Sequence, residues 1–491
     1  MGYIGNAPYQ GVLTGGNIQD GTVETTDLAD AAVTTAKLHD QAVTAGKLAA
    51  TLDLTGKTVT LPAGVGQPEA GTTANRPANP DIGTLYFDTD LDVLINYTST
   101  GWLKVVVIVP IITSVTGDIV QTVATTLTLA GTDFLAGSGT VKFTSGGTTE
   151  NVSVTPSSTT SLTVAVPASI YGLSGGATVS ITFTNSDGGT SAAQTKTVQA
   201  LPTGGAVTTS GGYRYHTFIT SSSLVVPSGF TATAEYLIVG GGGGGVSRLA
   251  QIGCGGSGAG GVVSGSVSLS ASTTYTITVG NGGPGYTTTA ISEGTVTASN
   301  GLNSSAFSQT AIGGGGGHGG QAGTAGSGGS GGGAGAGDGA GAAGAGTLGQ
   351  GNAGGNGTAS GNNAVRAAGG GGGAGGAGQS ASSGTCGDGG VGTSSFSAWG
   401  AATSTGHNVS GTYYYAGGSG GASTVASSKQ QGTGGYGGGA NGKAGLSAAS
   451  PGNNGMENTG GGGGPIASYV GPPLVGGNGG SGIVIVRYQS S

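Results

Sequence analysis

Glycine accounts for 115 of the 491 residues, and nearly all of the excess lies after about residue 240. Apolar segments bracket this glycine block, with residues 236–239 directly before the glycine run 240–245 and residues 483–488 at the end of the chain. A flexible linker seldom ends in a strong β-strand, whereas a folded domain does. Because glycine has no side chain to bury, a folded glycine block must be held by backbone hydrogen bonds. The block therefore predicts a structural or adhesive protein of extracellular type rather than an enzyme.

Within the block, glycine occupies every third position from Gly314 to Gly335. Three residues per turn is the period of the polyproline-II helix, and glycine at every third site lets such helices approach one another closely. The run contains no proline and its register fails at Asp338, which argues against collagen. The pattern favours a sheaf of polyglycine-II-type helices framed by β-strands. The alternative is a flexible glycine linker.

Charge and composition narrow the class of protein further. Charged residues make up 7% of the chain, against roughly a quarter in ordinary globular domains, and aromatic residues make up 5%. The net charge of −7, without a Lys/Arg cluster, argues against nucleic acid or an anionic membrane as partner. The N-terminal residues have neither the basic nor the apolar region of a signal peptide. A surface-like composition without a secretion signal is expected of a virion protein, which is made in a cytoplasm and used outside it.

Residues 11–50 form a ten-residue repeat that aligns without gaps. Its apolar positions recur every five residues, which matches neither a helix nor a single straight strand. One unit cannot bury its two apolar residues alone, so three chains around an axis are the favoured solution, and a monomeric solenoid is the alternative. The expected trimer core consists of Val23, Leu28, Val33, Leu38, Val43 and Leu48.

The remaining sequence reads as short β-strands. Residues 83–87 and 93–97 predict two strands around an Asp-rich turn, in a small β module. Regularly spaced alternating segments between residues 110 and 200 predict a β-sandwich. We therefore expect a mostly β, elongated multi-domain fibre. Its parts are an N-terminal attachment segment (1–17), a repeat shaft (18–65), the β module (66–107), an immunoglobulin-like domain (108–200) and a glycine-rich adhesin domain (201–491).

Two groups of residues raise the question of metal or redox chemistry. Asp88, Asp90 and Asp92 alternate as in a calcium loop, but position 93 is Val where an EF-hand requires Gly, and no Glu completes the loop. A hairpin turn is the preferred interpretation. Cys254 and Cys386 are expected to be buried small residues rather than a disulfide, and their spacing fits no metal site. The four histidines lie in different segments without patterned partners, so we expect no catalytic site, cofactor or metal.

Several motifs, in this order along the chain, resemble tail fibres and receptor-binding adhesins of tailed bacteriophages. Residues 2–8 resemble the start of many such fibres, and the repeat 32–38 resembles their shaft repeats. Residues 73–80 and 83–90, with Gly101 and Trp102, are similar to a β module of phage structural proteins. Residues 110–115, 131–134, 166–167 and 184–191 resemble an immunoglobulin-like IPT/TIG domain. Residues 235–488 are similar to the glycine-rich domain of fibres and adhesins.

The resemblance implies a non-enzymatic tail fibre that is assembled in the host cytoplasm and located on the virion tail. Its expected partners are two further copies of the chain, tail or baseplate proteins at the N-terminus, and a host polysaccharide or outer-membrane protein. Neither nucleic-acid binding nor membrane insertion is expected. The alternatives are a purely structural tail or capsid-decoration protein, a cellular adhesin or ice-binding protein, and a polysaccharide-degrading tailspike. The last would need a carboxylate pair, and acids are scarce after residue 200.

Receptor recognition is expected where aromatic residues interrupt the glycine tracts. Aromatic side chains with polar tips bind sugars or protein surfaces at low entropic cost. They could instead be the hydrophobic filler of the sheaf. The candidates are Phe396, Trp399, His407, Tyr413, Tyr414, Tyr415 and Tyr469.

Overall fold

The structure is a computed structural model of the 491-residue chain. It describes residues 68–105, 107–249, 252–289, 294–339, 341–359, 366–424, 431–445, 451–468 and 473–490. The decapeptide repeat and its expected trimer core therefore lie outside the described residues, as does Tyr469. The chain divides into two compact units, residues 1–106 and 107–491, and each is described by itself.

The described part of the first unit is a four-stranded sheet in the order β1-β2-β3-β4. Its elements are β1 (Glu69–Gly71), the short 3-10 helix η5 (Thr73–Asn75), β2 (Leu85–Asp88), β3 (Val93–Thr98) and β4 (Gly101–Lys104). The two strands expected around an Asp-rich turn are confirmed as β2 and β3. One face of the sheet carries the buried cluster of Tyr86, Val93 and Ile95, with Trp102 packed against it.

Asp88 organises the turn of this module. Its carboxylate is fully buried and forms an ion pair with Arg76. It also accepts hydrogen bonds from the Thr73 hydroxyl and from the backbone N–H groups of Asp90 and Leu91. Burial by itself would raise the pKa of Asp88, but these hydrogen bonds outweigh it and hold the pKa below its ordinary value. The interpretation as a hairpin turn is confirmed.

Residues 111–199 form the expected β-sandwich. A three-stranded sheet (β10-β7-β5) faces a five-stranded sheet (β6-β12-β11-β8-β9), and alternating side chains of both sheets fill the core between them. The elements are β5 (Ile111–Thr116), β6 (Ile119–Val120), β7 (Thr126–Thr132), β8 (Gly139–Ser145), β9 (Thr148–Val154), β10 (Ser161–Ala165), α1 (Ala168–Tyr171), β11 (Thr178–Thr184) and β12 (Gln194–Gln199).

Two polar residues fasten the start of the sandwich to its core. The Asn185 side-chain amide donates to the carbonyl oxygens of Ile108 and Asp133, and its oxygen accepts the N–H of Leu135. The Asp187 carboxylate accepts the N–H of Ile108. Both side chains are buried. The polar segment 184–191 therefore has a structural role, because it satisfies backbone groups that strand pairing leaves open.

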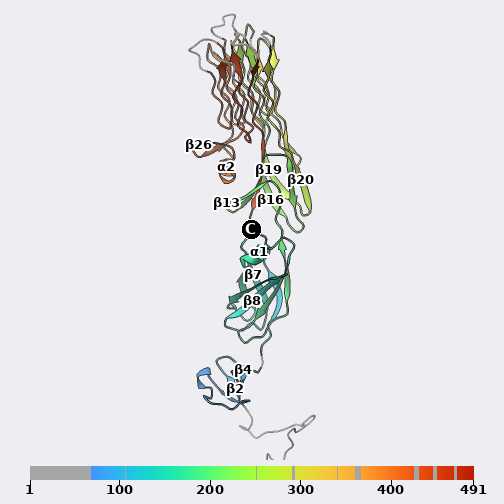
Figure 1. The fold of residues 1–491 in the computed structure, drawn as a ribbon, viewed down its shortest axis with the longest axis vertical. Coiled ribbons are helices and arrows are strands. Elements are labelled where there is room, and N and C mark those ends of the chain that lie inside the picture. The colour runs from blue at the N-terminus through green and yellow to red at the C-terminus, as the bar shows by residue number, and fades with distance from the viewer. Residues whose placement is uncertain are drawn as a thin grey trace, which may run out of the picture. The chain divides into compact units, whose positions relative to one another are not determined.

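A five-stranded antiparallel sheet in the order β13-β14-β32-β16-β19 is the base of the glycine-rich part (Figure 1). Its strands are β13 (Ala206–Ser210), β14 (Tyr213–Phe218), β32 (Ile483–Gln489), β16 (Ala232–Val239) and β19 (Val262–Leu269). The last strand of the chain pairs with both β14 and β16. Side chains of β32 enter one core from one face and a second core from the other. Burial of both faces explains why residues 483–486 are continuously apolar.

Beyond this sheet, extended glycine segments lie side by side (Figure 1). Residues 240–245 show how they are held. Their N–H groups donate in turn to carbonyl oxygens of three neighbouring chain segments. The first segment accepts from Gly240 and Gly243, at residues 261 and 258 respectively. The second accepts from residues 241 and 244, at 302 and 299, and the third from residues 242 and 245, at 480 and 477. Each neighbour is therefore met every third residue. This is the repeat of a polyproline-II-type helix.

Three further chain segments pack against residues 240–245, and their close approach explains why these six residues are glycine. A Cβ atom on Gly240 would lie 2.5 Å from the carbonyl oxygen of Ile312, and one on Gly243 would lie 2.2 Å from that of Gly315. On a second side, Cβ atoms on residues 241 and 244 would meet the backbone of residues 281–284. On the third side, Cβ atoms on residues 242 and 245 would meet the backbone of residues 461–464. No φ in 240–245 is positive. Glycine is required here by the close approach of six surrounding chain segments rather than by backbone conformation.

The third-position run from Gly314 to Gly335 is not a single helix. Gly314 and Gly317 donate to Gly241 and Gly244, as the period predicts. The chain then turns at Gly320, whose φ is +116°. Gly326 and Gly329 donate back to Gly316 and Gly313. The prediction of a glycine sheaf is confirmed. The three-residue spacing of glycine, however, continues through chain reversals that the sequence pattern did not reveal.

Short strands and one further helix complete the glycine-rich part. They are β15 (Ser222–Val226), β17 (Ser247–Leu249), β18 (Gly253–Cys254), β20 (Thr273–Ile277), β21 (Thr287–Thr288), β22 (Val296–Thr297), β23 (Ser304–Ala306), β24 (Gln309–Ala311), β25 (His318–Gly319), α2 (Ser397–Thr403), β26 (His407–Val409), β27 (Thr412–Tyr414), β28 (Ala422–Ser423), β29 (Lys443–Gly445), β30 (Ile466–Ser468) and β31 (Leu474–Val475). The chain is thus mostly β, as the sequence predicted.

Candidate functional site

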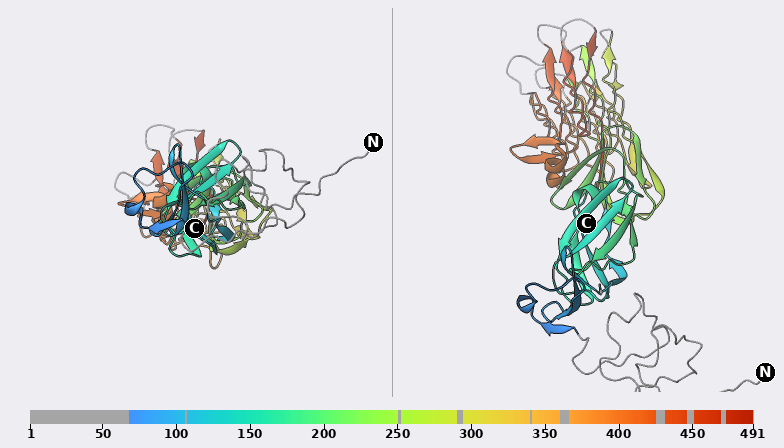
Figure 2. Two further views of the ribbon diagram at one scale, coloured as in Figure 1. Left: turned by 90° about the horizontal axis from the view of Figure 1, so that it is seen from below. Right: turned by 60° about the horizontal axis from the view of Figure 1, so that its bottom comes forward.

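A helix and a hairpin interrupt the glycine segments and stand at the side of the sheaf (Figure 2). The insertion comprises α2, β26 and β27. It is closed at its base by two backbone hydrogen bonds between Thr393 and Tyr415. At its tip Ser410 and Gly411 both have positive φ, as a two-residue hairpin turn requires. The Asn408 side-chain oxygen accepts the N–H of Gly411. The sequence Asn-Val-Ser-Gly thus fixes a tight hairpin.

Arg487 of β32 joins the insertion to the sheet. Its guanidinium lies 4.1 Å from the ring centroid of Tyr213 and 4.5 Å from that of Trp399. It also forms an ion pair with Glu235 at 2.7 Å. A guanidinium can stack on aromatic rings and bind a carboxylate at the same time. The last strand of the chain therefore holds α2 in place.

Two of the expected receptor-binding residues belong to the core. Tyr415 is fully buried, and its hydroxyl lies 2.7 Å from that of Thr405. Burial raises its pKa to about 12. Trp399 is 6% exposed and packs edge-on against Tyr215 and Phe396. The expectation that Trp399 and Tyr415 contact a receptor is therefore corrected, because the sheet and the sheaf cover both rings. They are the hydrophobic filler considered as the alternative.

Phe396 and Tyr413 are half-buried between α2 and the hairpin. Phe396 packs against the cluster that contains Trp399. The Tyr413 side chain lies so close to Gly400 that a Cβ there would be 2.5 Å from the Tyr413 Cβ. Its backbone N–H donates to the Ser397 hydroxyl. Both aromatic residues mainly fasten the hairpin to the helix.

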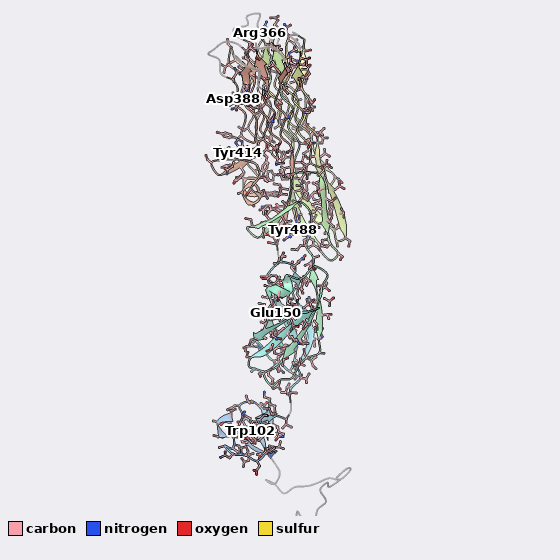
Figure 3. The ribbon with its side chains drawn as sticks, viewed as in Figure 1. Trp102, Glu150, Arg366, Asp388, Tyr414 and Tyr488 are labelled. Carbon is pink, nitrogen blue, oxygen red and sulfur yellow. The ribbon has the colours of Figure 1, made fainter. Side chains whose placement is uncertain are left out.

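His407 and Tyr414 of the insertion form an accessible cluster with Tyr436, which lies in a neighbouring glycine segment, and we call these three residues the aromatic patch. The ring centroids of Tyr414 and Tyr436 are 5.5 Å apart, and those of His407 and Tyr436 are 6.3 Å apart. Tyr436 is 49% exposed, and His407 and Tyr414 are half-buried. Figure 3 labels Tyr414 at the side of the glycine-rich part. Tyr436 was not among the sequence candidates because it is an isolated aromatic in a glycine tract.

Backbone groups of the sheaf orient the aromatic patch. Nδ1 of His407 accepts the N–H groups of Gly437 and Gly438. This places the proton of the neutral imidazole on Nε2. The Tyr436 carbonyl oxygen accepts the N–H of Gly392. The patch therefore offers two phenol hydroxyls, an imidazole N–H and aromatic ring faces on a fixed backbone, which suits binding to a sugar or protein surface.

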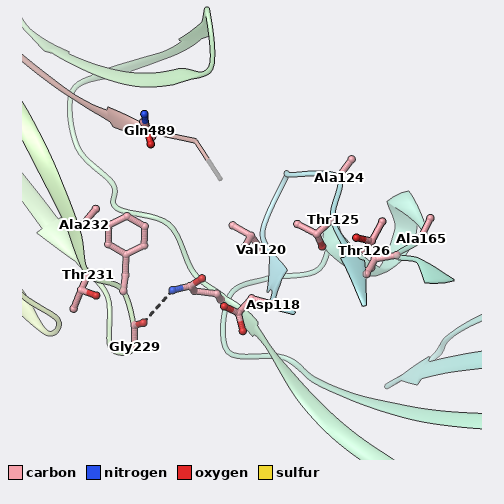
Figure 4. Close-up of a pocket in the computed structure, with 13 residues that line it drawn as sticks. Asp118, Val120, Ala124, Thr125, Thr126, Ala165, Gly229, Thr231, Ala232 and Gln489 are labelled. Carbon is pink, nitrogen blue, oxygen red and sulfur yellow. Dashed lines mark hydrogen bonds between the residues drawn. The ribbon is translucent and has the colours of Figure 1, made fainter. Parts of the chain in front are cut away.

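A hollow lies where the sandwich meets the glycine-rich part in the second unit (Figure 4). Asp118, Val120 and Thr125 line it from one side, and Phe230 and Gln489 from the other. Gln199 bridges the two sides through a hydrogen bond from its side-chain nitrogen to the carbonyl oxygen of Gly229. Asp118 faces Lys196 at 3.7 Å. This hollow holds a single carboxylate and no histidine or cysteine, so its lining offers no pair of acid and base groups.

The two cysteines and two of the histidines are buried. Cys254 and Cys386 are free thiols, as expected. Burial raises their pKa values to about 12 and about 11, which makes them poor nucleophiles. Burial lowers the pKa of His216 to about 4 and also lowers that of His318. In the described ranges no three His, Cys, Asp or Glu residues lie together as a metal site would need. None of the helices described there is long and apolar enough to cross a membrane.

Fold and site together define a mostly β protein whose largest part is a glycine scaffold held by backbone hydrogen bonds. Comparison with family models finds a glycine-rich domain over residues 216–489. This match covers more than half of the chain, and the protein belongs to that glycine-rich domain family.

Two further comparisons add little. A search of curated proteins finds no match. Among solved structures, the FN1–FN3 domains of chicken CNTN1 are similar, with 12% identity, coverage of 38% of this chain and 67% of that chain, and a TM-score of 0.15. A likeness at that TM-score supports no conclusion about fold or function.

Proposed function

We propose that the protein is a non-enzymatic tail fibre of a tailed bacteriophage that attaches to the host surface through its glycine-rich part. The observation that carries the proposal is the aromatic patch, three accessible rings fixed on a backbone that is itself fixed by the sheaf. A preorganised aromatic surface loses little entropy on binding. The order of fibre-like motifs along the sequence supports the phage setting.

The chemistry of the patch favours a polysaccharide or an outer-membrane protein as receptor. Tyr414 and Tyr436 have ring faces that can stack on the apolar face of a sugar, and their hydroxyls can bond to its polar edge. No charged side chain takes part in the ring contacts of the patch. Binding should therefore depend weakly on salt.

The assembly that we propose is a homotrimer located on the virion tail and attached to tail or baseplate proteins through its N-terminal residues. It binds no nucleic acid and inserts in no membrane. The scarcity of charge along the chain supports this assignment, because both partners would favour a basic surface.

Adsorption of the purified chain to host cells tests the proposal. The variant Tyr414→Ala with Tyr436→Ala should reduce adsorption at least tenfold with an unchanged melting temperature. The matched control is Tyr286→Ala, because Tyr286 is also partly exposed on the glycine-rich part and lies apart from the patch in sequence. Control adsorption should equal that of the wild type.

Two results would reject the proposal. If the wild-type chain binds no host cell, the purely structural alternative is favoured. If both variants adsorb like the wild type, the patch is not the receptor site.

A further inference from the structure

A smaller cavity adjoins the hollow of Figure 4 and shares Ala124, Phe230 and Gln489 with it. Its volume is about 230 Å³. Sites for drug-sized ligands measure roughly 300–1,000 Å³, so this cavity has the size for a small molecule. The loop between β6 and β7 lines it from one side, and the sheet of β13, β14 and β32 lines it from the other.

Arg214 gives the cavity a positive charge. Strand register places Arg214 of β14 between Thr209 of β13 and Tyr488 of β32, and side chains directly opposite one another in antiparallel strands share a face. All three residues line the cavity. The Nε atom of Arg214 is buried and has no hydrogen-bond partner among the residues that the structure describes. A buried donor without an acceptor costs free energy, and a guanidinium does not release its proton at any ordinary pH.

The described part of the chain supplies no counter-charge for Arg214. Its ion pairs join other residues, and no acidic side chain is among the described residues that line the cavity. Asp118, in the adjoining hollow, faces Lys196. The Tyr488 hydroxyl already donates to Nε2 of His216. An anionic ligand would therefore satisfy a group that the described protein leaves unpaired.

The walls of the cavity indicate which anion fits. Val123, Leu201 and Phe230 are apolar, and the Phe230 ring packs edge-on against Tyr488 at 5.2 Å. Among the described lining residues Arg214 is the one cation. A single positive charge beside apolar walls matches a singly charged group on an apolar body better than a sulfate or a phosphate, which carries more charge and more water. A guanidinium binds a carboxylate through two parallel hydrogen bonds.

The loop that closes the cavity is held in place without a ligand. Thr122 has a φ of +60°, a conformation that β-branched residues rarely adopt. Its N–H donates to the carbonyl oxygen of Tyr171 in α1, and the N–H of Val123 donates to that of Val120. The surrounding structure therefore maintains the strained loop. Since the cavity is preformed, a ligand pays little entropy to order it.

We propose that this cavity binds a small monocarboxylate, with the carboxylate on the Arg214 guanidinium and the body of the molecule against Val123, Leu201 and Phe230. The carboxylate can belong to a free apolar acid or to an acidic sugar unit, whose ring also has an apolar face. A bound molecule contacts both the β6–β7 loop and the sheet, so it stabilises the folded protein. This inference does not depend on what the aromatic patch binds.

Calorimetric titration of the full chain tests the proposal. Benzoate is the probe for a free apolar acid, and glucuronate is the probe for an acidic sugar. At least one of them should bind with a dissociation constant below about 1 mM. Its neutral counterpart, benzamide or glucose, and inorganic sulfate should bind at least tenfold more weakly. The carboxylate that binds more tightly identifies the source of the ligand, and the proposal is overturned if neither binds.

Three variants locate the binding site. Arg214→Met should raise the dissociation constant at least tenfold, because it keeps the length of the side chain and removes the charge. Lys142→Met is the matched control, since it removes the same charge from an exposed position of β8, and it should leave the constant within twofold. Ala124→Leu fills the cavity, keeps every charge and should also weaken binding at least tenfold.

Thermal melts separate loss of binding from loss of folding. Without ligand, Arg214→Met should melt no lower than the wild type, because it removes an unpaired charge. The bound carboxylate should raise the melting temperature of the wild type and of Lys142→Met, but not that of Arg214→Met or Ala124→Leu. The proposal is overturned if Arg214→Met and Ala124→Leu bind the carboxylate as tightly as Lys142→Met does, since the ligand then lies elsewhere.

Discussion

At the scale of single residues, a methyl group is too large for most positions of the sheaf. A Cβ on Gly243 would lie 2.2 Å from the carbonyl oxygen of Gly315 and 2.6 Å from its carbon. Backbone atoms cannot move aside as a flexible side chain can. By contrast, a Cβ on Gly376 would meet the Val391 side chain at 3.3 Å, and its φ is not positive. The need for glycine is therefore specific to position rather than a general property of the block.

We expect Gly243→Ala to lower the free energy of unfolding by about 3 kcal/mol, at the upper end of overpacking effects. The control Gly376→Ala should change it by less than about 0.5 kcal/mol. Denaturant titration of the two variants measures both values. Equal stability of the two variants would contradict close packing around residues 240–245.

His216 should make stability depend on pH. Nδ1 lies 2.7 Å from the carbonyl oxygen of Gly204, to which it donates, and Nε2 accepts from the Tyr488 hydroxyl at 3.2 Å, so both nitrogens are used by the neutral ring. The folded pKa of about 4 is below the unfolded value of 6.5, so acid protonates the unfolded chain first. Stability should fall as the pH drops from about 6.5 to 4, by on the order of 3 kcal/mol. Thermal melts across this range should show a smaller slope for His216→Phe, and an unchanged slope would refute the assignment.

At the scale of elements, the last strand decides where the insertion sits. Arg487 in β32 stacks on Tyr213 of β14 and on Trp399 of α2. The three elements are distant in sequence, so this contact forms only after the chain has returned from the sheaf. The aromatic patch depends on it, since the hairpin is packed on α2.

We expect Arg487→Ala to loosen the insertion and to lower stability by about 1–3 kcal/mol, through lost stacking and an unpaired Glu235. Arg487→Lys should recover only part of this loss, because an ammonium keeps the charge but not the planar stacking surface. Limited proteolysis should show faster cleavage in residues 393–415 in the order Ala, Lys, wild type. Equal cleavage rates would show that the guanidinium does not hold α2.

At the scale of the whole molecule, the glycine-rich part is stabilised by backbone hydrogen bonds between distant segments. Amide exchange should therefore be slow in residues 240–245, whose N–H groups are all bonded to other segments. Gly146 and Gly211 lie in turns with positive φ and open surroundings, and their exchange should be fast. Uniformly fast exchange would return the block to the class of flexible linkers.

Much of this architecture could be predicted from local sequence patterns. Alternation in residues 85–104 and 111–199 predicted strands, because a side-chain period of two leaves few other choices. Composition and the bracketing apolar segments predicted a folded glycine sheaf. Of the site, the sequence located the insertion and its tyrosines. It could not separate Tyr414, which is accessible, from Tyr415, which is buried, since adjacent residues of an extended segment differ only in the side to which they point.

The sequence by itself determined that the chain is mostly β and that residues 240–245 must lie against other backbone, because glycine has no other means of being buried. The tertiary structure alone decided which segments surround them, where the third-position period reverses at Gly320, and that Tyr436 joins His407 and Tyr414. These are contacts between residues far apart in the chain. They form where the chain folds back and its segments pack closely together. Glycine tracts with nearly identical local sequence contain no signal that distinguishes one neighbouring segment from another.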